Sequence, residues 1–341
     1  MRLTSKAVIA TALSGVYFLF GLSFSLPVSA QTELLINNYL PPKHPFQVGI
    51  VEPWIKQVIE ATKGSVTPKL SAGRVGPPPK NWQTVTKGVA DVVVLANVFQ
   101  PKRIQLPTIS QLPLNSPSAE KTSIALWETH QKFFAKADEY KGAKLLGSFV
   151  GSPNVIHHGS KPINSVADLK GVKLRAAPGI STKILKQAGA VPVASGPAKI
   201  FNLVSKGVVD GVAVPAYGLR SFRIMPYVKF TTTIPGGLTN TSFSFLVNQA
   251  KWDSLSKEQQ AQIMKVSGRV ISENARKVDE VSSASLEALK KEGGQVIKAS
   301  PEFIEEIRKL ALGAENEWKK AALAKGIDAD AALAFYREQL K

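Results

Sequence analysis

The segment VTKGVADVVVLANV at residues 85–98 recurs with few changes as VSKGVVDGVAVPAY at residues 204–217. In each copy, a Lys-Gly pair follows a short helical pattern and leads into a run of apolar residues. That order is typical of a turn from a helix into a buried strand. A chain that contains the same turn and strand twice is expected to have two similarly built halves. The repeat therefore predicts a two-lobed α/β protein.

The segments around each copy support this interpretation. Residues 33–37, 65–71 and 90–96 have strand patterns, and a helical pattern around Trp54 that closes at Gly64 separates the first two. The second half has the same rhythm, with strands at 172–176, 190–195 and 209–216 and helices between them. Alternating strands and helices predict a parallel sheet in each lobe. We expect lobe 1 to comprise residues 31–150 plus about 240–280, and lobe 2 residues 151–239 plus about 281–341.

The longest helical pattern begins after Ser256, a natural N-cap with Gln259 at the capping-box position, and stops at Gly293. About 36 helical residues would span roughly 54 Å at about 1.5 Å each. One lobe does not need that length, so the pattern predicts a helix that runs along both lobes. A kink or break near Gly268 is the alternative. A further amphipathic helix is expected after Ser300.

The N-terminus has the order of a secretory signal. MRLTSK is basic, residues 7–26 are almost wholly apolar, and VSA precedes Gln31. Cleavage after Ala30 would leave a periplasmic protein, whereas an uncleaved run would serve as a membrane anchor. The absence of cysteine excludes disulfides, zinc thiolate sites and cysteine nucleophiles.

The net charge of +18 favours anionic partners. Nucleic acid is not an expected partner, because the Lys and Arg residues are scattered and no basic run is interleaved with aromatics. The charge is that of a solvated basic surface or of a protein that attracts a small anion.

Residues with catalytic or metal-binding potential form no familiar motif. His157 and His158 are neighbours on a predicted strand and point to opposite faces, and neither HExxH nor a carboxylate cluster occurs. The sequence contains no GxSxG, no Walker loop and no GxGxxG. We therefore expect neither an enzyme, nor a metal site, nor a cofactor.

Arg175 in GVKLRAAPG is the strongest candidate for ligand binding. It lies at the end of a predicted strand and precedes small residues and Pro178-Gly179. In open α/β layers, ligands bind beyond the carboxyl ends of strands, and the planar fork of an Arg suits a carboxylate. A surface or inter-element salt bridge is the alternative.

Several segments, in this order, resemble the substrate-binding proteins of tripartite ATP-independent periplasmic (TRAP) transporters. They are NYLPPKHPFQVGIVEPWIKQVIEATKG, TVTKGVADVVV, INSVADLKGVKLRAAPG, KQAGAVPVA and IFNLVSKGVVDGVAVP, and the resemblance covers nearly all of the mature chain. It implies a type II-like periplasmic binding protein: two α/β lobes joined by hinge segments, with a long lobe-spanning helix, closing on a small organic acid. The receptor would deliver that acid to a membrane permease. In the family, the Arg of LKGxKxR holds the ligand carboxylate, and that residue matches Arg175.

The chain departs from the family pattern at two places. Relatives often follow VDG with Glu-Asn-Pro, whose Asn faces the ligand, whereas this chain has Ala213, Val214 and Pro215. Many also carry an Arg near the position of Asn154, where this chain has none. These losses argue against a dicarboxylate or sialic acid and favour a monocarboxylate, such as a 2-oxo, hydroxy, aromatic or branched acid.

Other ligand-lining residues are expected only from their positions in loops or near strand ends. They are Tyr39 and His44 in the first loop, Asn97 after the first repeated strand, Asn154, Tyr217 after the second, and Thr239, Asn240 and Phe243 where the chain returns. A structural loop role is the alternative for each. Trp54, Trp127 and Trp318 lie on apolar helix faces and are expected in the core.

The leading prediction is a monomeric periplasmic solute receptor of a TRAP transporter, with a small organic acid and the permease as partners. One alternative is a two-lobed receptor that serves another transporter or a sensor kinase. The other is an enzyme that acts on an organic acid, which would need a general acid or base near Arg175.

Overall fold

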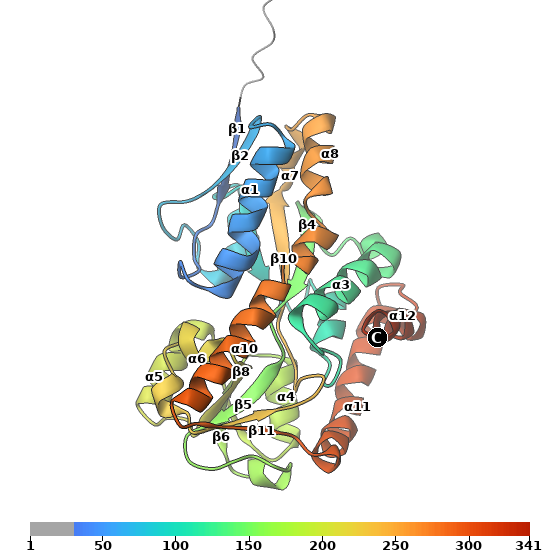
Figure 1. Cartoon of the computed structure of the whole chain (residues 1–341). Helices are drawn as coiled ribbons and strands as arrows, with labels where there is room; N and C mark the ends of the chain where they lie inside the picture. Colours follow the sequence, from blue (N-terminus) through green and yellow to red (C-terminus); the bar gives the residue numbers. More distant parts are fainter. Residues whose placement is uncertain (1–30) are drawn as a thin grey trace, which may run out of the picture. The chain divides into compact units, whose positions relative to one another are not determined.

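The computed structural model describes residues 31–341, whose strands form two separate sheets (Figure 1). The predicted signal segment lies outside the described residues. The first sheet has five strands in the order β2-β1-β3-β10-β4. β1 is parallel to β2 and β3, and β10 is antiparallel to β3 and β4. The strands are β1 (Thr32–Ile36), β2 (Val66–Leu70), β3 (Val92–Ala96), β4 (Ala143–Val150) and β10 (Ser242–Asn248).

The second sheet has six strands in the order β11-β9-β5-β8-β6-β7. β6 is parallel to β7 and β8, β11 is parallel to β9, and β5 is antiparallel to β8 and β9. The strands are β5 (Asn154–His158), β6 (Lys173–Ala176), β7 (Val191–Ala194), β8 (Gly211–Pro215), β9 (Phe230–Thr233) and β11 (Gln295–Lys298). The mixed α/β fold with two sheets is as predicted, although antiparallel strands enter both sheets.

Helices alternate with the strands along the chain, as the sequence predicts. The Trp54 pattern forms α1 after a π-helical turn at Gln47–Val51, and Ala167–Leu169, before β6, forms a 3₁₀ turn. Within residues 31–341 the α-helices are α1 (Glu52–Ala61), α2 (Asn81–Thr86), α3 (Ala119–Thr129), α4 (Ile180–Gln187), α5 (Ile200–Ser205), α6 (Gly218–Ser221), α7 (Gln249–Asp253), α8 (Lys257–Lys265), α9 (Arg269–Glu273), α10 (Arg276–Lys291), α11 (Pro301–Leu323) and α12 (Ala329–Gln339).

The two repeated segments build the same structure in the two sheets. Gly88 follows α2 with φ +68°, and Gly207 follows α5 with φ +63°. The carboxylate of Asp91 then accepts the backbone N–H of Leu35 at 2.8 Å, which ties β3 to β1. The carboxylate of Asp210 accepts the N–H of Lys173, also at 2.8 Å, and ties β8 to β6. The repeat therefore preserves a backbone anchor as well as a turn.

The expected single long helix is wrong, because the chain forms α8, α9 and α10 instead. The break between α8 and α9 lies at Gly268, whose φ is +57° and whose N–H donates to the carbonyl of Leu146 at 2.6 Å, and a second interruption at residues 274–275 separates α9 from α10. A Cβ at this position would come within 2.7 Å of the Trp127 ring. The backbone therefore lies tightly against β4 and α3, where a continuous helix does not fit. The series still runs along both sheets, from α8 beside α1 to α10 beside β11 (Figure 1).

The predicted N-caps of α8 and α11 and the predicted burial of three tryptophans are confirmed. The capping box of Ser256 and Gln259 is formed, and Ser300 caps α11. Trp54, Trp127 and Trp318 are all buried. One core cluster joins residues next to α3 with α4, α11 and α12, so it draws on segments assigned to both predicted lobes. The assignment of whole segments to lobes stays a prediction.

Candidate functional site

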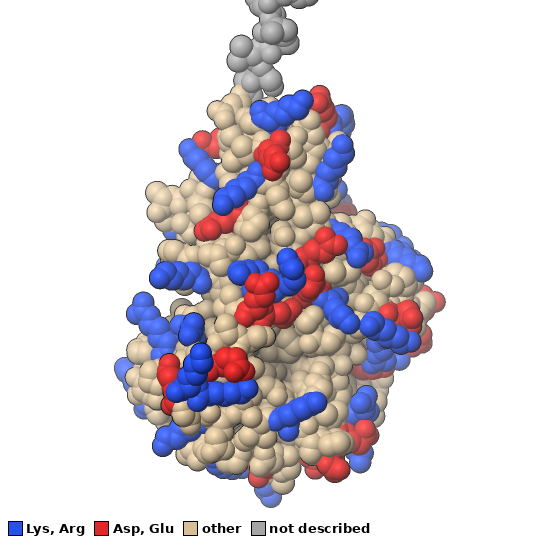
Figure 2. Space-filling view, in the orientation of Figure 1, with Lys and Arg blue, Asp and Glu red and all other residues tan. Residues whose placement is uncertain are grey.

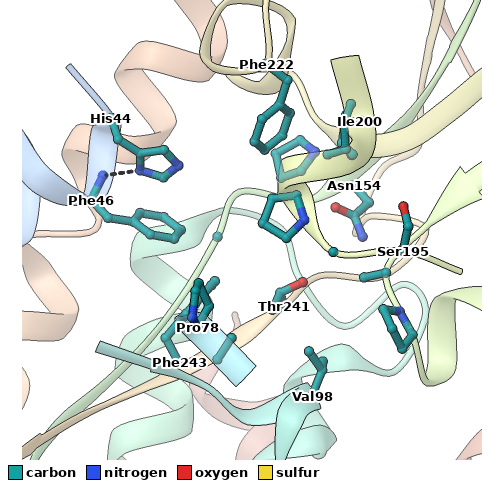
Figure 3. A pocket seen from close by; sticks show the side chains of 18 of the residues that line it. His44, Phe46, Pro78, Val98, Asn154, Ser195, Ile200, Phe222, Thr241 and Phe243 are labelled. Atoms are coloured by element: carbon teal, nitrogen blue, oxygen red, sulfur yellow. Dashed lines mark hydrogen bonds between the residues drawn. The ribbon is translucent and has the colours of Figure 1, made fainter. Parts of the chain in front are cut away.

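A cavity of about 120 Å³ lies where strand ends from both sheets meet the loop that precedes α1 (Figure 3). The first sheet contributes the carboxyl end of β3, and the second contributes the carboxyl ends of β6 and β8 and the segment after β7. Ligands of open α/β layers bind at such ends. The lining residues are Tyr39, Leu40, His44, Phe46, Pro78, Ala96, Val98, Phe99, Gly151, Asn154, Arg175, Ala177, Pro178, Ser195, Gly196, Pro197, Ile200, Ala213, Val214, Pro215, Tyr217, Phe222, Thr241 and Phe243.

Arg175 is the buried cation of this cavity, with a relative exposure of 4%. It lies on β6 between β7 and β8. Its Nε donates to Ser195 Oγ at 3.2 Å, and its Nη2 donates to the Ser195 carbonyl. No Asp or Glu within residues 31–341 forms an ion pair with it. Its Nη1 donors are therefore free of protein acceptors in the described chain.

Burial removes water from the guanidinium and lowers the pKa of Arg175 to about 10. The neighbouring Tyr217 partly opposes this lowering. The side chain is still charged at neutral pH. A buried charge without a counterion is costly. An anion that enters the cavity would supply the missing partner.

Tyr217 and Tyr39 also line the cavity, and their hydroxyls differ in availability. The Tyr39 hydroxyl donates to the carbonyl of Val94 at 2.9 Å. The Tyr217 hydroxyl has no hydrogen-bond partner among residues 31–341. Burial raises the pKa of both phenols above the usual value, so both are neutral. Tyr217 can therefore donate to a bound anion beside Arg175.

An aromatic cluster around Phe46 forms a further part of the wall and includes the ring of Tyr217. The ring of Phe46 makes edge contacts with Phe243 at 4.7 Å, Phe149 at 5.1 Å and Tyr217 at 5.8 Å between centroids. Phe243 lies on β10 across from Ala96 of β3. Such edge-to-face clusters favour an additional ring over an aliphatic chain. The cavity can therefore hold an apolar, flat ligand body.

His44 lies beside this cluster and is uncharged. Its Nδ1 accepts the backbone N–H of Phe46 at 3.2 Å, and its ring lies 5.6 Å from that of Tyr217. Burial lowers the pKa of His44 to about 4. The cavity therefore holds a single formal charge within reach of a ligand, that of Arg175, among its described lining residues.

Asn154 and Val214 line the cavity as expected from the sequence. Asn154 begins β5, and its Nδ2 donates to Thr239 Oγ1 at 2.9 Å. Val214 lies on β8, is 2% exposed, and presents an apolar side chain to the wall. The polar contact predicted to be absent at this wall is thus replaced by a hydrocarbon surface.

Asn97 and Asn240 are not among the lining residues of the cavity. Asn97 donates to Ser242 Oγ at 3.1 Å and accepts from Ser244 Oγ at 2.8 Å. Asn240 donates to Ser116 Oγ at 2.9 Å. Both amides are buried, and the Oδ1 of Asn240 has no hydrogen-bond partner among residues 31–341. Because neither residue lines the cavity, its geometry gives no support for a direct ligand contact by either.

Sequence reasoning did not identify Phe46, Ser195, Phe222 or Thr241 as lining residues. Ser195 directly follows β7, so the strand-end rule that identified Arg175 could have found it. Phe46 and Phe222 carry no such signal, because an aromatic residue in a loop or helix is more often part of the core.

The surface agrees with the expectation of scattered charge. Figure 2 shows Lys and Arg spread over the visible face and interspersed with Asp and Glu. The buried guanidinium of Arg175, rather than a basic patch on this face, is therefore the feature that indicates an anionic ligand.

Residues 36–321 match the family described as bacterial extracellular solute-binding protein, family 7. The chain is 31% identical over 319 residues to the outer membrane transporter protein TsaT of Comamonas testosteroni, covering 92% of this chain and 94% of that protein.

Two solved structures are also similar to this chain. A TRAP periplasmic solute-binding protein of Bordetella bronchiseptica with bound (R)- and (S)-mandelate is 34% identical, with a TM-score of 0.86, over 91% of this chain and 98% of that one. A marine metagenome TRAP solute-binding protein specific for aromatic acids, in complex with 3-hydroxybenzoate, is 29% identical, with a TM-score of 0.83 over the same shares. The resemblance to TRAP receptors is thereby confirmed.

Proposed function

Because the chain belongs to family 7 of the bacterial extracellular solute-binding proteins, we propose that it is a receptor for an aromatic monocarboxylic acid. The observation that carries the proposal is Arg175, a buried cation without a protein counterion in an otherwise uncharged cavity. A ligand carboxylate would engage the free Nη1 donors while Ser195 holds the rest of the guanidinium. The family binds solutes, and we propose that this member likewise transforms none.

The cavity dimensions and lining favour one ring. An apolar cavity of about 150 Å³ binds one benzene molecule, and the volume of this cavity, about 120 Å³, is of the same order, which leaves no room for a second ring. Phe46 and Phe243 offer ring edges and faces, and Val214 closes the wall with methyl groups. The mandelate and the 3-hydroxybenzoate bound in two similar receptors each contain one aromatic ring.

The same features disfavour a dicarboxylate. Arg175 is the only Lys or Arg among the described lining residues, and Val214 offers no hydrogen bond. A second carboxylate would be buried without a cation to pair with, which costs several kcal/mol. We therefore expect discrimination against succinate and against larger polar acids such as sialate.

We propose that binding closes the two sheets around the acid. Two of the three crossover segments between the sheets, residues 151–153 and 234–241, contribute to the wall through Gly151 and Thr241. Rotation about them would remove the Arg175–carboxylate pair from water and strengthen it. The closed receptor would then deliver the acid to a TRAP membrane permease.

We also propose that the protein acts in the periplasm after cleavage of residues 1–30. No helix among residues 31–341 is long and apolar enough to cross a membrane. The similar TRAP receptor of Bordetella bronchiseptica is described as periplasmic, whereas TsaT is named for the outer membrane.

The proposal is tested with protein purified from a periplasmic extract. Native mass spectrometry should reveal a co-purified small acid, and calorimetric titration should give tight binding of benzoate, 3-hydroxybenzoate or mandelate. A strong heat with succinate or sialate and none with monocarboxylates would overturn it.

A further inference from the structure

The polar end of His44 faces the cavity. His44 lines the cavity wall and is 7% exposed, between the rings of Phe46 and Tyr217. Its Nε2 has no hydrogen-bond partner among residues 31–341. Figure 3 shows this second ring nitrogen turned away from Phe46 and toward the cavity interior. It is therefore a polar group available to a ligand in an otherwise aromatic part of the wall.

The hydrogen-bond pattern determines where the imidazole proton resides. The backbone N–H of Phe46 donates to Nδ1 at 3.2 Å, so Nδ1 must carry a lone pair. In a neutral imidazole, the remaining proton then belongs to Nε2. In a protonated ring, Nδ1 would carry an N–H that faces the N–H of Phe46, so the hydrogen bond between them would be lost. Burial also disfavours the charged form of the ring. Nε2 is thus held as a neutral hydrogen-bond donor.

The His44 Nε2–H and the guanidinium of Arg175, which we propose binds the ligand carboxylate, lie on different sides of the cavity. In Figure 3, His44 and Ser195 lie on opposite sides of the cavity, and Ser195 is the residue that holds the Arg175 guanidinium. A bound acid with its carboxylate at Arg175 therefore directs the far part of its body toward His44. An acceptor on that body, such as a hydroxyl or an oxo oxygen, can satisfy Nε2–H.

We propose that His44 is a specificity-determining residue, whose Nε2–H donates to a hydroxyl or oxo oxygen on the body of the bound aromatic acid. This inference rests on the proposed function, because it assumes that Arg175 binds the carboxylate. An acid without the oxygen leaves the buried N–H unpaired, and an unsatisfied buried donor costs more than a formed hydrogen bond gains. His44 therefore selects oxygenated aromatic acids over their unsubstituted parents.

Matched ligand pairs test the selection. Calorimetry compares mandelate with phenylacetate and 3-hydroxybenzoate with benzoate, on the wild type and on two variants of the purified protein. His44→Asn keeps an acceptor near Nδ1 for the Phe46 N–H and lacks the donor at the Nε2 position. His44→Gln places an amide N–H near Nε2 and serves as the conservative variant.

We expect the wild type to favour the oxygenated member of at least one pair by about tenfold in Kd. His44→Asn should reduce that preference to less than threefold, whatever the loss of its ring contacts with Phe46 and Tyr217 does to the affinity for both members of a pair, and His44→Gln should restore part of the preference. Equal weakening of both members by His44→Asn, or no wild-type preference in either pair, would overturn the role of His44. If the wild type binds none of the four acids, the proposed function itself fails.

Discussion

Arg175 directs two of its guanidinium donors at one residue, Ser195: Nε at the side-chain hydroxyl and Nη2 at the backbone carbonyl. Arg175 lies on β6 and Ser195 directly follows β7, and these strands are paired in parallel through Arg175 and Val193. Sheet register therefore sets the orientation of the fork. The planar group is held on one side, and Nη1 stays free for a ligand.

Ser195→Ala removes the acceptor of the Arg175 Nε and leaves the carbonyl that Nη2 uses. We expect the Kd for an aromatic acid to rise about threefold to tenfold, because one hydrogen bond that orients the fork is lost. Calorimetric titration measures this change. Thr182→Ala, which removes a hydroxyl bonded to the Gly179 carbonyl outside the cavity lining, is the matched control and should leave Kd unaltered. Equal Kd values for Ser195→Ala and the wild type would contradict the orienting role.

Gly268→Ala should destabilise the fold far more than Gly293→Ala. Both glycines have positive φ, +57° and +84°, which costs a residue with a Cβ about 1–2 kcal/mol. At Gly268, the new methyl group also meets Trp127 at 2.7 Å, whereas nothing lies within 4 Å at Gly293. We expect a loss of roughly 3 kcal/mol or more at Gly268, since overpacking typically adds about 1–3 kcal/mol. Urea denaturation of both variants checks this, and equal losses would contradict the close approach.

His157 should make the free energy of unfolding depend on pH. It is fully buried on β5, its Nδ1 is 2.8 Å from Thr231 Oγ1, and burial lowers its pKa from 6.5 to about 4. Between these values the unfolded chain binds a proton that the folded chain does not. Stability from this residue is therefore present above about pH 6.5 and lost as the pH falls toward 4, by at most about 1.4 kcal/mol per pH unit.

His157→Asn keeps a polar atom near Thr231 and does not titrate. Urea denaturation of both proteins between pH 7 and pH 4.5 should therefore show a shallower decline for the variant. Other groups with shifted pKa values, such as Asp279 and Glu139, contribute equally to both proteins and cancel in the comparison. Parallel pH profiles would show that His157 does not remain neutral in the folded protein.

Local sequence signals were sufficient for much of the fold. The two Lys-Gly turns, at Gly88 and Gly207, predict the strands that end at the cavity, because a positive φ after a helix and an apolar run are both local properties. The break at Gly268 is different. Its cause is the approach of Leu146 and Trp127, which are distant in the sequence, so periodicity alone cannot distinguish it from a continuous helix.

The residues of the candidate site likewise fall into those that local sequence position predicts and those that depend on tertiary contacts. Arg175 and Tyr217 lie at or just after strand ends, and position in an α/β layer predicts their place in the cavity. Asn97 also follows a strand, but its amide is hydrogen-bonded to Ser242 and Ser244 of β10. The sequence pattern does not reveal that β10 pairs with β3 at this place. Phe46 enters the cavity through packing against Phe243, which only the assembled sheets define.

The most direct test of the central claim is calorimetric titration of Arg175 variants with the aromatic acid that binds the wild type. Truncating one partner of a buried charge pair costs about 2–5 kcal/mol. Arg175→Ala should therefore raise Kd roughly 30-fold to several thousandfold, and Arg175→Lys should also bind poorly because it lacks the fork. Arg220→Ala, which removes an exposed cation on α6, should match the wild type. A change of less than threefold in Kd for either Arg175 variant would contradict the assignment of Arg175 as the carboxylate clamp.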